Sequence, residues 1–429
     1  MKLIQTKDID FYYITCLNDL ITLIDSLQDY SYVGLDSETY VDLTKINSSA
    51  LDPHSNKISL LQLNYKDNKY PFVIDVLQIE QEDNLDYLVN NLFLNSSICK
   101  VLHNASFDIK AIYSHFGIWM KNVLCTRTLM QSLGICTGMK ASIFRGHSLK
   151  DLSRDYFSII LDKTEATSQW GARPLTESQL AYAAIDVGAP KNTSHTSILL
   201  EGMDIIKDEL VRLNQEFSFT ADQQAMFISA KLEYEGMYID KTILQMVKDY
   251  AEEQTNANRK FLVEELGFTV YTDTDINDDG EWISIQVIPD KIKTLLNNNK
   301  GLVDYINAYL SSIGEETLSS LQAQEVKIYL DALEKEVDSE ESKQFDEEFF
   351  DNKYDSMKLI KALLNYKKYN KLLSECDKYF KVINQNTNKV HAGFNPVGTA
   401  TGRMSSSGDL NLQQVSNTGV KLSVSRDQF

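Results

Sequence analysis

Short apolar runs dominate the first part of the chain, and they predict strands there. Val33, Gly34 and Leu35 read as the end of a buried strand. Two further apolar runs flank a Lys-Asp-Asn-Lys turn, which predicts a strand on each side of it. After the first run we expect strands at 57–64, 70–75 and 98–102, and helices at 84–94, 103–113, 149–157 and 177–194. Three antiparallel strands followed by alternating strand and helix predict an α/β fold, a mixed sheet covered by helices.

The pattern changes near residues 195–205, where strands nearly disappear and the helical period takes over. Amphipathic patterns predict helices at 203–234, 242–266 and 357–383, with a hairpin around 282–288 between them. An acid-rich run of eleven acids against three lysines, from Asp331 to Asp355, lies in this region as an insertion. We therefore expect three domains: residues 1–198, a mainly helical region over 199–393, and a short segment over 394–429.

Two carboxylates, Asp36 and Glu38, directly follow the first apolar run. Side chains alternate faces along a strand, so both point the same way, with Ser37 between them. Two like charges held that close repel each other unless a cation lies between them. Carboxylate oxygens suit Mg²⁺ or Mn²⁺ better than zinc. Taken alone, such a pair is more often a plain acidic strand end, so the rest of the chain decides its meaning.

Two further pairs have helical spacing. Asn104 and Asp108 are four residues apart at an expected helix start, and Tyr182 and Asp186 are four apart on another helical pattern. With Asp36 and Glu38, the two aspartates make four carboxylates, enough to hold two divalent ions for displacement at phosphorus. A tyrosine one turn from a ligand aspartate could orient the attacking water. Each pair alone is common on solvated helices, and the signal lies in their order and context.

Composition and charge place limits on the partners. The 429 residues carry a formal charge of −19, which by itself argues against binding to nucleic acid. The charge is uneven, however, because residues 357–403 hold nine basic residues against two acids. Five scattered cysteines and the lack of a signal peptide or membrane-spanning run predict a cytoplasmic protein, from a bacterium or a virus-infected host cell, with no membrane partner.

At this point the sequence resembles a known family, the DEDD 3′–5′ exonucleases, including the proofreading domain of family A DNA polymerases and ribonuclease D. The resemblance covers about residues 30–190 and is carried by 34–39, 103–108, 147–152, 161–163, 169–171 and 175–186. It implies a ribonuclease H-like mixed sheet with flanking helices. It also implies that Asp36, Glu38, Asp108 and Asp186 bind two Mg²⁺ or Mn²⁺ ions, and that Tyr182 positions the water. Asn104 and Thr39 would lie near the substrate strand.

The second half resembles the thumb and early palm of family A polymerases. Residues 232–240 are similar to the segment that opens the thumb, and 394–414 contain a Thr-Gly-Arg motif that contacts primer–template backbone in that family. In this sequence the motif offers Arg403 as a charged fork for phosphate. The other residues expected to bind nucleic acid are Ser405, Ser406, Asn411 and Gln413, with Lys367 and Lys368 on the basic thumb helix.

The polymerase aspartates of that family, in an Asp-Tyr-Ser-type strand and a His-Asp-Glu turn, have no counterpart in this sequence. The expectation is therefore a DNA proofreading exonuclease joined to a thumb, truncated at the start of the palm. We expect its partners to be single-stranded 3′ ends, primer–template DNA and a separate palm-and-fingers subunit. Two alternatives stay open: a ribonuclease D-like exoribonuclease, and a non-catalytic DNA-binding subunit.

Overall fold

The computed structural model describes residues 1–42, 44–45, 49–137, 146–162, 164–266, 271–276, 282–287, 307–308, 311, 314, 347–399, 401–408 and 410–415. The chain divides into two compact units, one formed by Met1–Ile239 with Val382–Gln414 and the other by Asp240–Lys381 with Val415–Phe429. The three-domain division expected from the sequence stays a prediction. Most of the acidic insertion, and residues 416–429 of the expected palm segment, lie outside the described residues.

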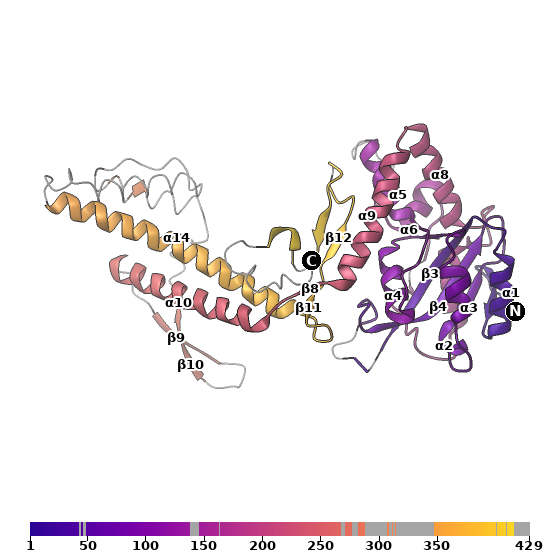
Figure 1. Ribbon diagram of the computed structural model, residues 1–429, viewed down its shortest axis with the longest axis horizontal. Helices are drawn as coiled ribbons and strands as arrows, with labels where there is room; N and C mark the ends of the chain where they lie inside the picture. The colour runs from indigo at the N-terminus through magenta and orange to yellow at the C-terminus, as the bar shows by residue number, and fades with distance from the viewer. Residues whose placement is uncertain are drawn as a thin grey trace. The chain divides into compact units, whose positions relative to one another are not determined.

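The first unit is built on a seven-stranded mixed sheet (Figure 1). Its strand order is β1-β2-β5-β4-β3-β6-β7, so the long strand β3 (Tyr32–Val41) lies inside the sheet. β3 pairs antiparallel with β4 (Asn56–Tyr65) and parallel with β6 (Cys99–Leu102). The remaining strands are β1 (Lys2–Gln5), β2 (Asp10–Ile14), β5 (Phe72–Asp75) and β7 (Val123–Cys125).

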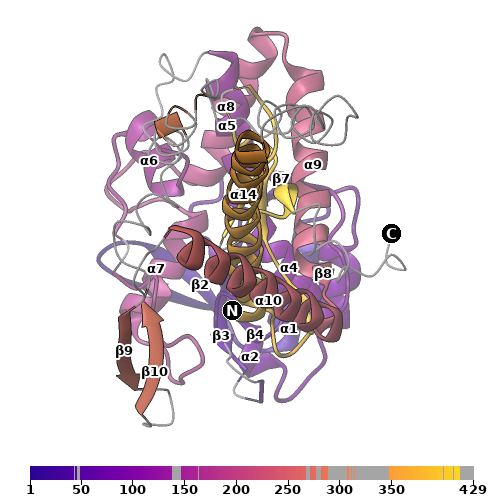
Figure 2. The same cartoon turned by 90° about the vertical axis from the view of Figure 1, so that its left-hand side faces the viewer.

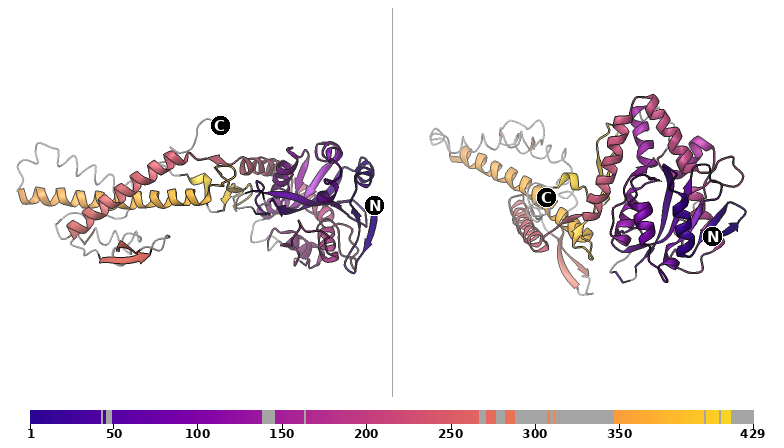
Figure 3. Two further views of the ribbon diagram at one scale, coloured as in Figure 1. Left: turned by 90° about the horizontal axis from the view of Figure 1, so that it is seen from below. Right: turned by 45° about the vertical axis from the view of Figure 1, so that its right-hand side comes forward.

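Helices cover both faces of this sheet; Figure 3 shows the strands lying between helices. On one face, the apolar side chains of α1 (Leu17–Ser26) and α4 (Ser106–Phe116) share a core with Val33 and Leu35 of β3. On the other, α7 (Glu177–Val187) packs on β3 and β4, and α8 (Ile198–Arg212) packs on β6. The other described helices of this unit are α2 (Val76–Ile79), α3 (Asp86–Leu88), a π-helical turn (Val89–Phe93), α5 (Thr126–Cys136), α6 (Leu149–Phe157), α9 (Glu216–Glu235) and a 3-10 helix (Leu412–Gln414). The predicted mixed sheet with flanking helices is confirmed.

Several elements differ from the sequence-based prediction. β1, β2, α1, β7 and α5 were not predicted. β3 does not end with its apolar run at Leu35 but continues to Val41, because β4 pairs with it along that whole length. The single helix expected at 203–234 is broken into α8 and α9, and Asn214 between them has a left-handed backbone (φ 54°) that ends a helix.

The second unit contains two long helices, α10 (Lys241–Leu266) and α14 (Glu347–Val382) (Figure 2). They pack together through the rings of Tyr250 and Tyr369, 5.7 Å apart, and through an ion pair of 2.8 Å between Lys248 and Asp377. β9 (Tyr271–Ile276) and β10 (Trp282–Val287) form the predicted hairpin. Within the part of the chain that is described, no helix is both long and apolar enough to cross a membrane.

Candidate active site

Strand β3 presents Asp36 and Glu38 on the face of the sheet that α7 and α8 cover. Gly34, two residues earlier, belongs to the same face, and a β-carbon there would lie 3.4 Å from Leu199 of α8. Ser37 alternates to the opposite face, where α4 packs. A bulge interrupts the pairing with β4 just after Glu38: Glu38 faces Leu60 and the next residue of β3 faces Ile58. Ser59 is therefore the extra residue of the bulge, a device that re-aims neighbouring side chains.

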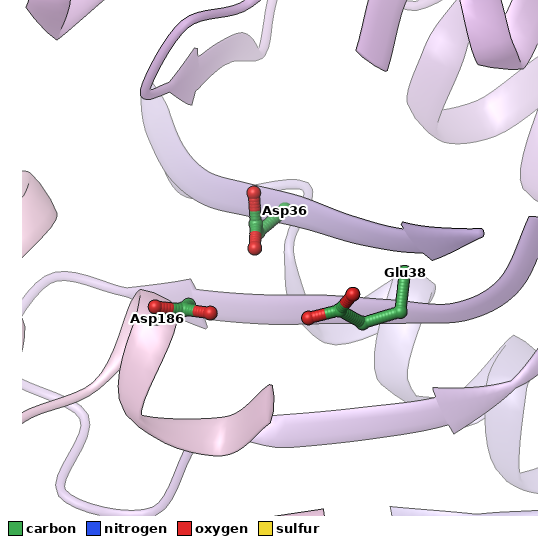
Figure 4. Close-up of side chains that lie close together, drawn as sticks. All are labelled: Asp36, Glu38 and Asp186. Carbon is green, nitrogen blue, oxygen red and sulfur yellow. The ribbon is translucent and has the colours of Figure 1, made fainter. Parts of the chain in front are cut away.

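Helix α7 brings a third carboxylate to this pair. The helix is fixed at its start by a capping box between Thr176 and Gln179, and Asp186 lies in its last turn. Oxygen atoms of Asp36, Glu38 and Asp186 all lie within 4.8 Å of one another, and Figure 4 shows the three side chains together. Asp186 is 6% exposed, while the other two are half-buried. Three oxygen donors at this spacing fit a hard divalent cation.

Asp108 stands apart from this group of three. It lies in the first turn of α4, is 2% exposed, and accepts a hydrogen bond of 2.6 Å from the Ser37 hydroxyl. Burial raises the pKa of Asp108 well above its usual range, and the negative charge of Asp186 raises it further. The structure thus brings together three of the four predicted carboxylates. The fourth, Asp108, is hydrogen-bonded to Ser37, which lies between Asp36 and Glu38 on β3.

A cleft of about 570 Å³ lies beside Asp186. Tyr182 and Asp186, one helical turn apart on α7, both line it. Residues 158–162, 164–165, 190 and 192–193 supply most of the remaining wall. Asp186 is thus the member of the three-carboxylate group that this cleft exposes.

The predicted substrate contacts differ in how exposed they are. Thr39 is 7% exposed, and its hydroxyl donates to the carbonyl of Ala50 at 2.8 Å. Asn104 is exposed, has a left-handed backbone (φ 61°), and accepts a hydrogen bond of 2.9 Å from Arg127. Asn104 and Arg127 line a second cleft of about 250 Å³, together with Lys110. Asn104 is thus open to a ligand, whereas the Thr39 hydroxyl is already engaged.

The Thr-Gly-Arg segment forms the turn of a hairpin between β12 (Gly393–Asn395) and β13 (Ser405–Ser407). Arg403 is exposed near the tip, and its backbone N–H donates to Thr399 at 2.9 Å. Ser405 and Ser406 are half-buried, and Asn411 and Gln413 are exposed in the short stretch that follows. In the second unit, Lys368 is exposed and Lys367 is half-buried, and burial lowers the pKa of Lys367.

Sequence reasoning gave no role to two buried charged groups of the first unit. Glu233 is 8% exposed, and its carboxylate accepts hydrogen bonds from Ser106, from Lys110 and from the backbone N–H of Phe394. Arg173 binds the fully buried Asp75 through two hydrogen bonds, of 2.9 and 2.6 Å. The partners of both groups are distant in sequence, so no local pattern could reveal them.

Two parts of the chain match models of known protein families. A model of the 3′–5′ exonuclease family matches residues 11–190, and a model of DNA polymerase family A matches residues 298–429. DNA polymerase I of Aquifex aeolicus is 24% identical over 411 residues, which cover 95% of this chain. The chain spans 58% of that relative's length. Exonuclease domains of this family are metal-dependent, and the described residues contain a candidate acidic cluster.

Two other relatives show how far each part of the similarity extends. Ribonuclease D of Musicola paradisiaca is 34% identical over 99 residues, which are 23% of this chain and 24% of that protein. The solved POL domain of Pol1 from M. smegmatis, in complex with DNA primer-template and dNTP, superposes with a TM-score of 0.56 at 16% identity. That superposition covers 94% of this chain and 56% of the other, and it shows a shared fold.

Proposed function

We propose that this chain is a family A DNA polymerase with a 3′–5′ exonuclease domain, and that this domain hydrolyses phosphodiester bonds at the 3′ ends of DNA. The observation that carries the proposal is the convergence of Asp36, Glu38 and Asp186 to within 4.8 Å. Such a group of acids is unfavourable without a cation, and one of its members, Asp186, lines a cleft. Removal of mismatched primer ends is the role that this activity would serve.

The donor set supports Mg²⁺ or Mn²⁺ as the cofactor. Asp36, Glu38 and Asp186 would hold one ion, and Asp108 would contribute to a second. When bound, the ions supply Lewis acidity that activates water and stabilises charge on the leaving 3′ oxygen. Asp108 must be ionised to serve as a ligand, and a nearby cation would oppose the burial that raises its pKa.

Tyr182 would orient the attacking water, since it lines the cleft one helical turn before Asp186. Asn104 would hold the substrate strand near the start of α4, where it is exposed. Thr39 would act through its backbone position on β3, because its hydroxyl is bonded to Ala50. These roles divide the site into a metal-holding part, a water-positioning part and a strand-holding part.

The hairpin with Arg403 and the basic face of α14 with Lys367 and Lys368 would contact primer–template DNA. Arg403 is exposed at a turn, and the flanking Ser405 and Ser406 are small enough for a backbone to approach closely. The similarity of residues 298–429 to DNA polymerase family A supports contact of this region with primer–template DNA.

A ribonuclease D-like activity on RNA is the second candidate, because one ribonuclease D is 34% identical over 99 residues. The test uses 5′-labelled single strands of DNA and RNA of one sequence, with Mg²⁺ and with EDTA. We expect stepwise shortening of the DNA from its 3′ end with Mg²⁺ only, and none by Asp36→Ala. Faster shortening of the RNA would favour the second candidate, and full activity of Asp36→Ala would overturn both.

A further inference from the structure

Trp170 lies at the centre of a small core beside α7. It is 4% exposed and belongs to a buried cluster with Leu180 and Ala184 of that helix. Tyr182 packs against the same cluster, and the two ring centroids are 6.1 Å apart with planes inclined by 38°. The ring that would orient water at the catalytic centre therefore rests on a core in which Trp170 is the largest side chain.

The backbone of Trp170 is held by two hydrogen bonds to its carbonyl oxygen. The hydroxyl of Ser59 donates one at 2.5 Å, and the guanidinium of Arg173 donates the other at 2.8 Å. Ser59 is the extra residue of the β4 bulge, directly beside Glu38 of the neighbouring strand. Ser59 thus links β4, the strand paired with the carboxylate strand β3, to the segment that supports Tyr182.

Arg173 is itself fixed from several sides. Two of its nitrogens bind the carboxylate of Asp75, which is fully buried and also accepts from the Tyr13 hydroxyl at 2.5 Å. A third bond runs from Arg173 to the Ser59 oxygen at 2.9 Å. A planar guanidinium held by so many acceptors has little freedom, so the carbonyl of Trp170 is fixed as well.

Two more observations show that the position of Trp170 is imposed by its surroundings. The indole N–H of Trp170 is buried and has no hydrogen-bond acceptor among the described residues. Buried tryptophan N–H groups usually donate a hydrogen bond. The next residue, Gly171, lies so close to Tyr40 of β3 that a β-carbon there would be 3.0 Å from that ring. The segment from Trp170 to Arg173 therefore packs closely against β3.

We infer that Trp170 is a positioning residue for Tyr182, held in place by Ser59 and Arg173. This inference rests on the proposed exonuclease function, since it assigns Trp170 to the reaction through the water-orienting tyrosine. Without the tryptophan ring the tyrosine can rotate into the space left behind, and its hydroxyl leaves the place where the water must be held. A misplacement of about 1 Å at such a contact costs up to about 100-fold in rate.

The test is a double-substitution cycle between Trp170→Ala and Tyr182→Phe on single-stranded DNA. We expect Trp170→Ala to lower kcat about tenfold, with KM and DNA binding in EDTA unchanged. In the Tyr182→Phe background the same substitution should have less than about a twofold effect, because the tyrosine it acts through is already altered. If the two substitutions lower kcat by independent factors that multiply in the double variant, or if Trp170→Ala changes KM alone, the inference is overturned.

Controls separate positioning from general destabilisation. Trp119→Ala removes another packed tryptophan, stacked on Tyr113 with ring centroids 4.0 Å apart, and should lower the melting temperature without lowering kcat. Trp170→Phe retains a supporting ring and should recover most of the turnover, which also covers the case in which Trp170→Ala does not fold. Equal loss of kcat in Trp119→Ala would show that stability alone explains the result.

A measurement that does not depend on catalysis can test the inference separately from the nuclease activity. With 3-fluorotyrosine incorporated at Tyr182, we expect one narrow fluorine NMR resonance that shifts and broadens in Trp170→Ala but stays unchanged in Trp119→Ala. A resonance unaffected by Trp170→Ala would refute the positioning role even in an active protein. Absence of nuclease activity in the parent protein, with the resonance responding as expected, would instead refute the proposed function alone.

Discussion

Replacing Asp186 with asparagine measures the electrostatic strain of the three-carboxylate group. The side-chain oxygens of Asp36, Glu38 and Asp186 lie within 4.8 Å of one another. Two unit charges at that separation repel by about 3.5 kcal/mol at an effective dielectric constant of about 20. Water screens the charges of the two half-buried partners, Asp36 and Glu38. The group can also relieve the repulsion by taking up a proton, which costs about 4 kcal/mol at pH 7. We therefore expect Asp186→Asn to raise the free energy of unfolding of the metal-free protein by about 1–3 kcal/mol.

Thermal unfolding followed by circular dichroism, in EDTA and in Mg²⁺, is the assay. In EDTA the melting temperature of Asp186→Asn should exceed that of the parent by several degrees, at about 2–4 °C per kcal/mol. Mg²⁺ at about 100 times its dissociation constant should stabilise the parent by about 2.7 kcal/mol, and it should stabilise Asp186→Asn far less. The substitution should abolish nuclease activity while stabilising the fold.

Glu177→Gln is the matched control, because it removes the same charge from the same helix at an exposed site in the first turn. It should change neither the response to Mg²⁺ nor the activity. If Asp186→Asn is less stable than the parent in EDTA, or gains as much from Mg²⁺, the three carboxylates do not form a strained cation site and the reasoning is wrong.

Three further predictions concern turnover, DNA contact and pH. Tyr182→Phe should lower kcat about 10- to 100-fold at unchanged KM, and a change in KM alone would contradict its role in orienting water. Lys367→Ala and Arg403→Ala should each reduce the salt dependence of primer–template binding by about 0.9 in log–log slope, whereas slopes equal to the parent's would exclude phosphate contact. Burial lowers the pKa of His391 from 6.5 to about 4, so below pH 6.5 the unfolded chain takes up a proton that the folded protein does not bind. The free energy of unfolding measured in urea should fall between pH 6.5 and 4, by about 1–2 kcal/mol at pH 5, and His391→Gln should flatten that fall.

Local periodicity predicted the parts of the site that depend on neighbours in sequence. Asp36 and Glu38 share a face because strand side chains alternate, and Tyr182 and Asp186 share one because a helix repeats every 3.6 residues. Both relations hold whatever the rest of the chain does. The convergence of Asp186 on the strand pair depends on how α7 packs, which spacing alone does not determine; the order of the four carboxylates and the resemblance to a family pointed to it.

Asp108 shows where spacing ceases to inform. Its distance from Asn104 placed it correctly near the start of a helix, but Asn104 is exposed and Asp108 is almost fully buried. The difference arises because α4 covers the face of β3 that Ser37 occupies, and Ser37 donates to the Asp108 carboxylate. The path of the chain through β6 sets which face of the sheet α4 covers. The polar pattern of α4 itself does not predict that face.

Glu233 explains why the compact unit that contains the sheet extends beyond the compositional boundary near residue 200. The compositional shift near residue 200 separates α9 from the sheet, yet the carboxylate of Glu233 on α9 accepts from Ser106 and Lys110 of α4 and from the backbone of Phe394. A buried carboxylate is tolerated only when it is paired and hydrogen-bonded, so its donors must stay together in the folded state. Those donors lie more than 120 residues away on either side of Glu233. The hairpin that carries Thr-Gly-Arg is thereby bonded to the same carboxylate that fixes the first turns of α4, where Asp108 lies.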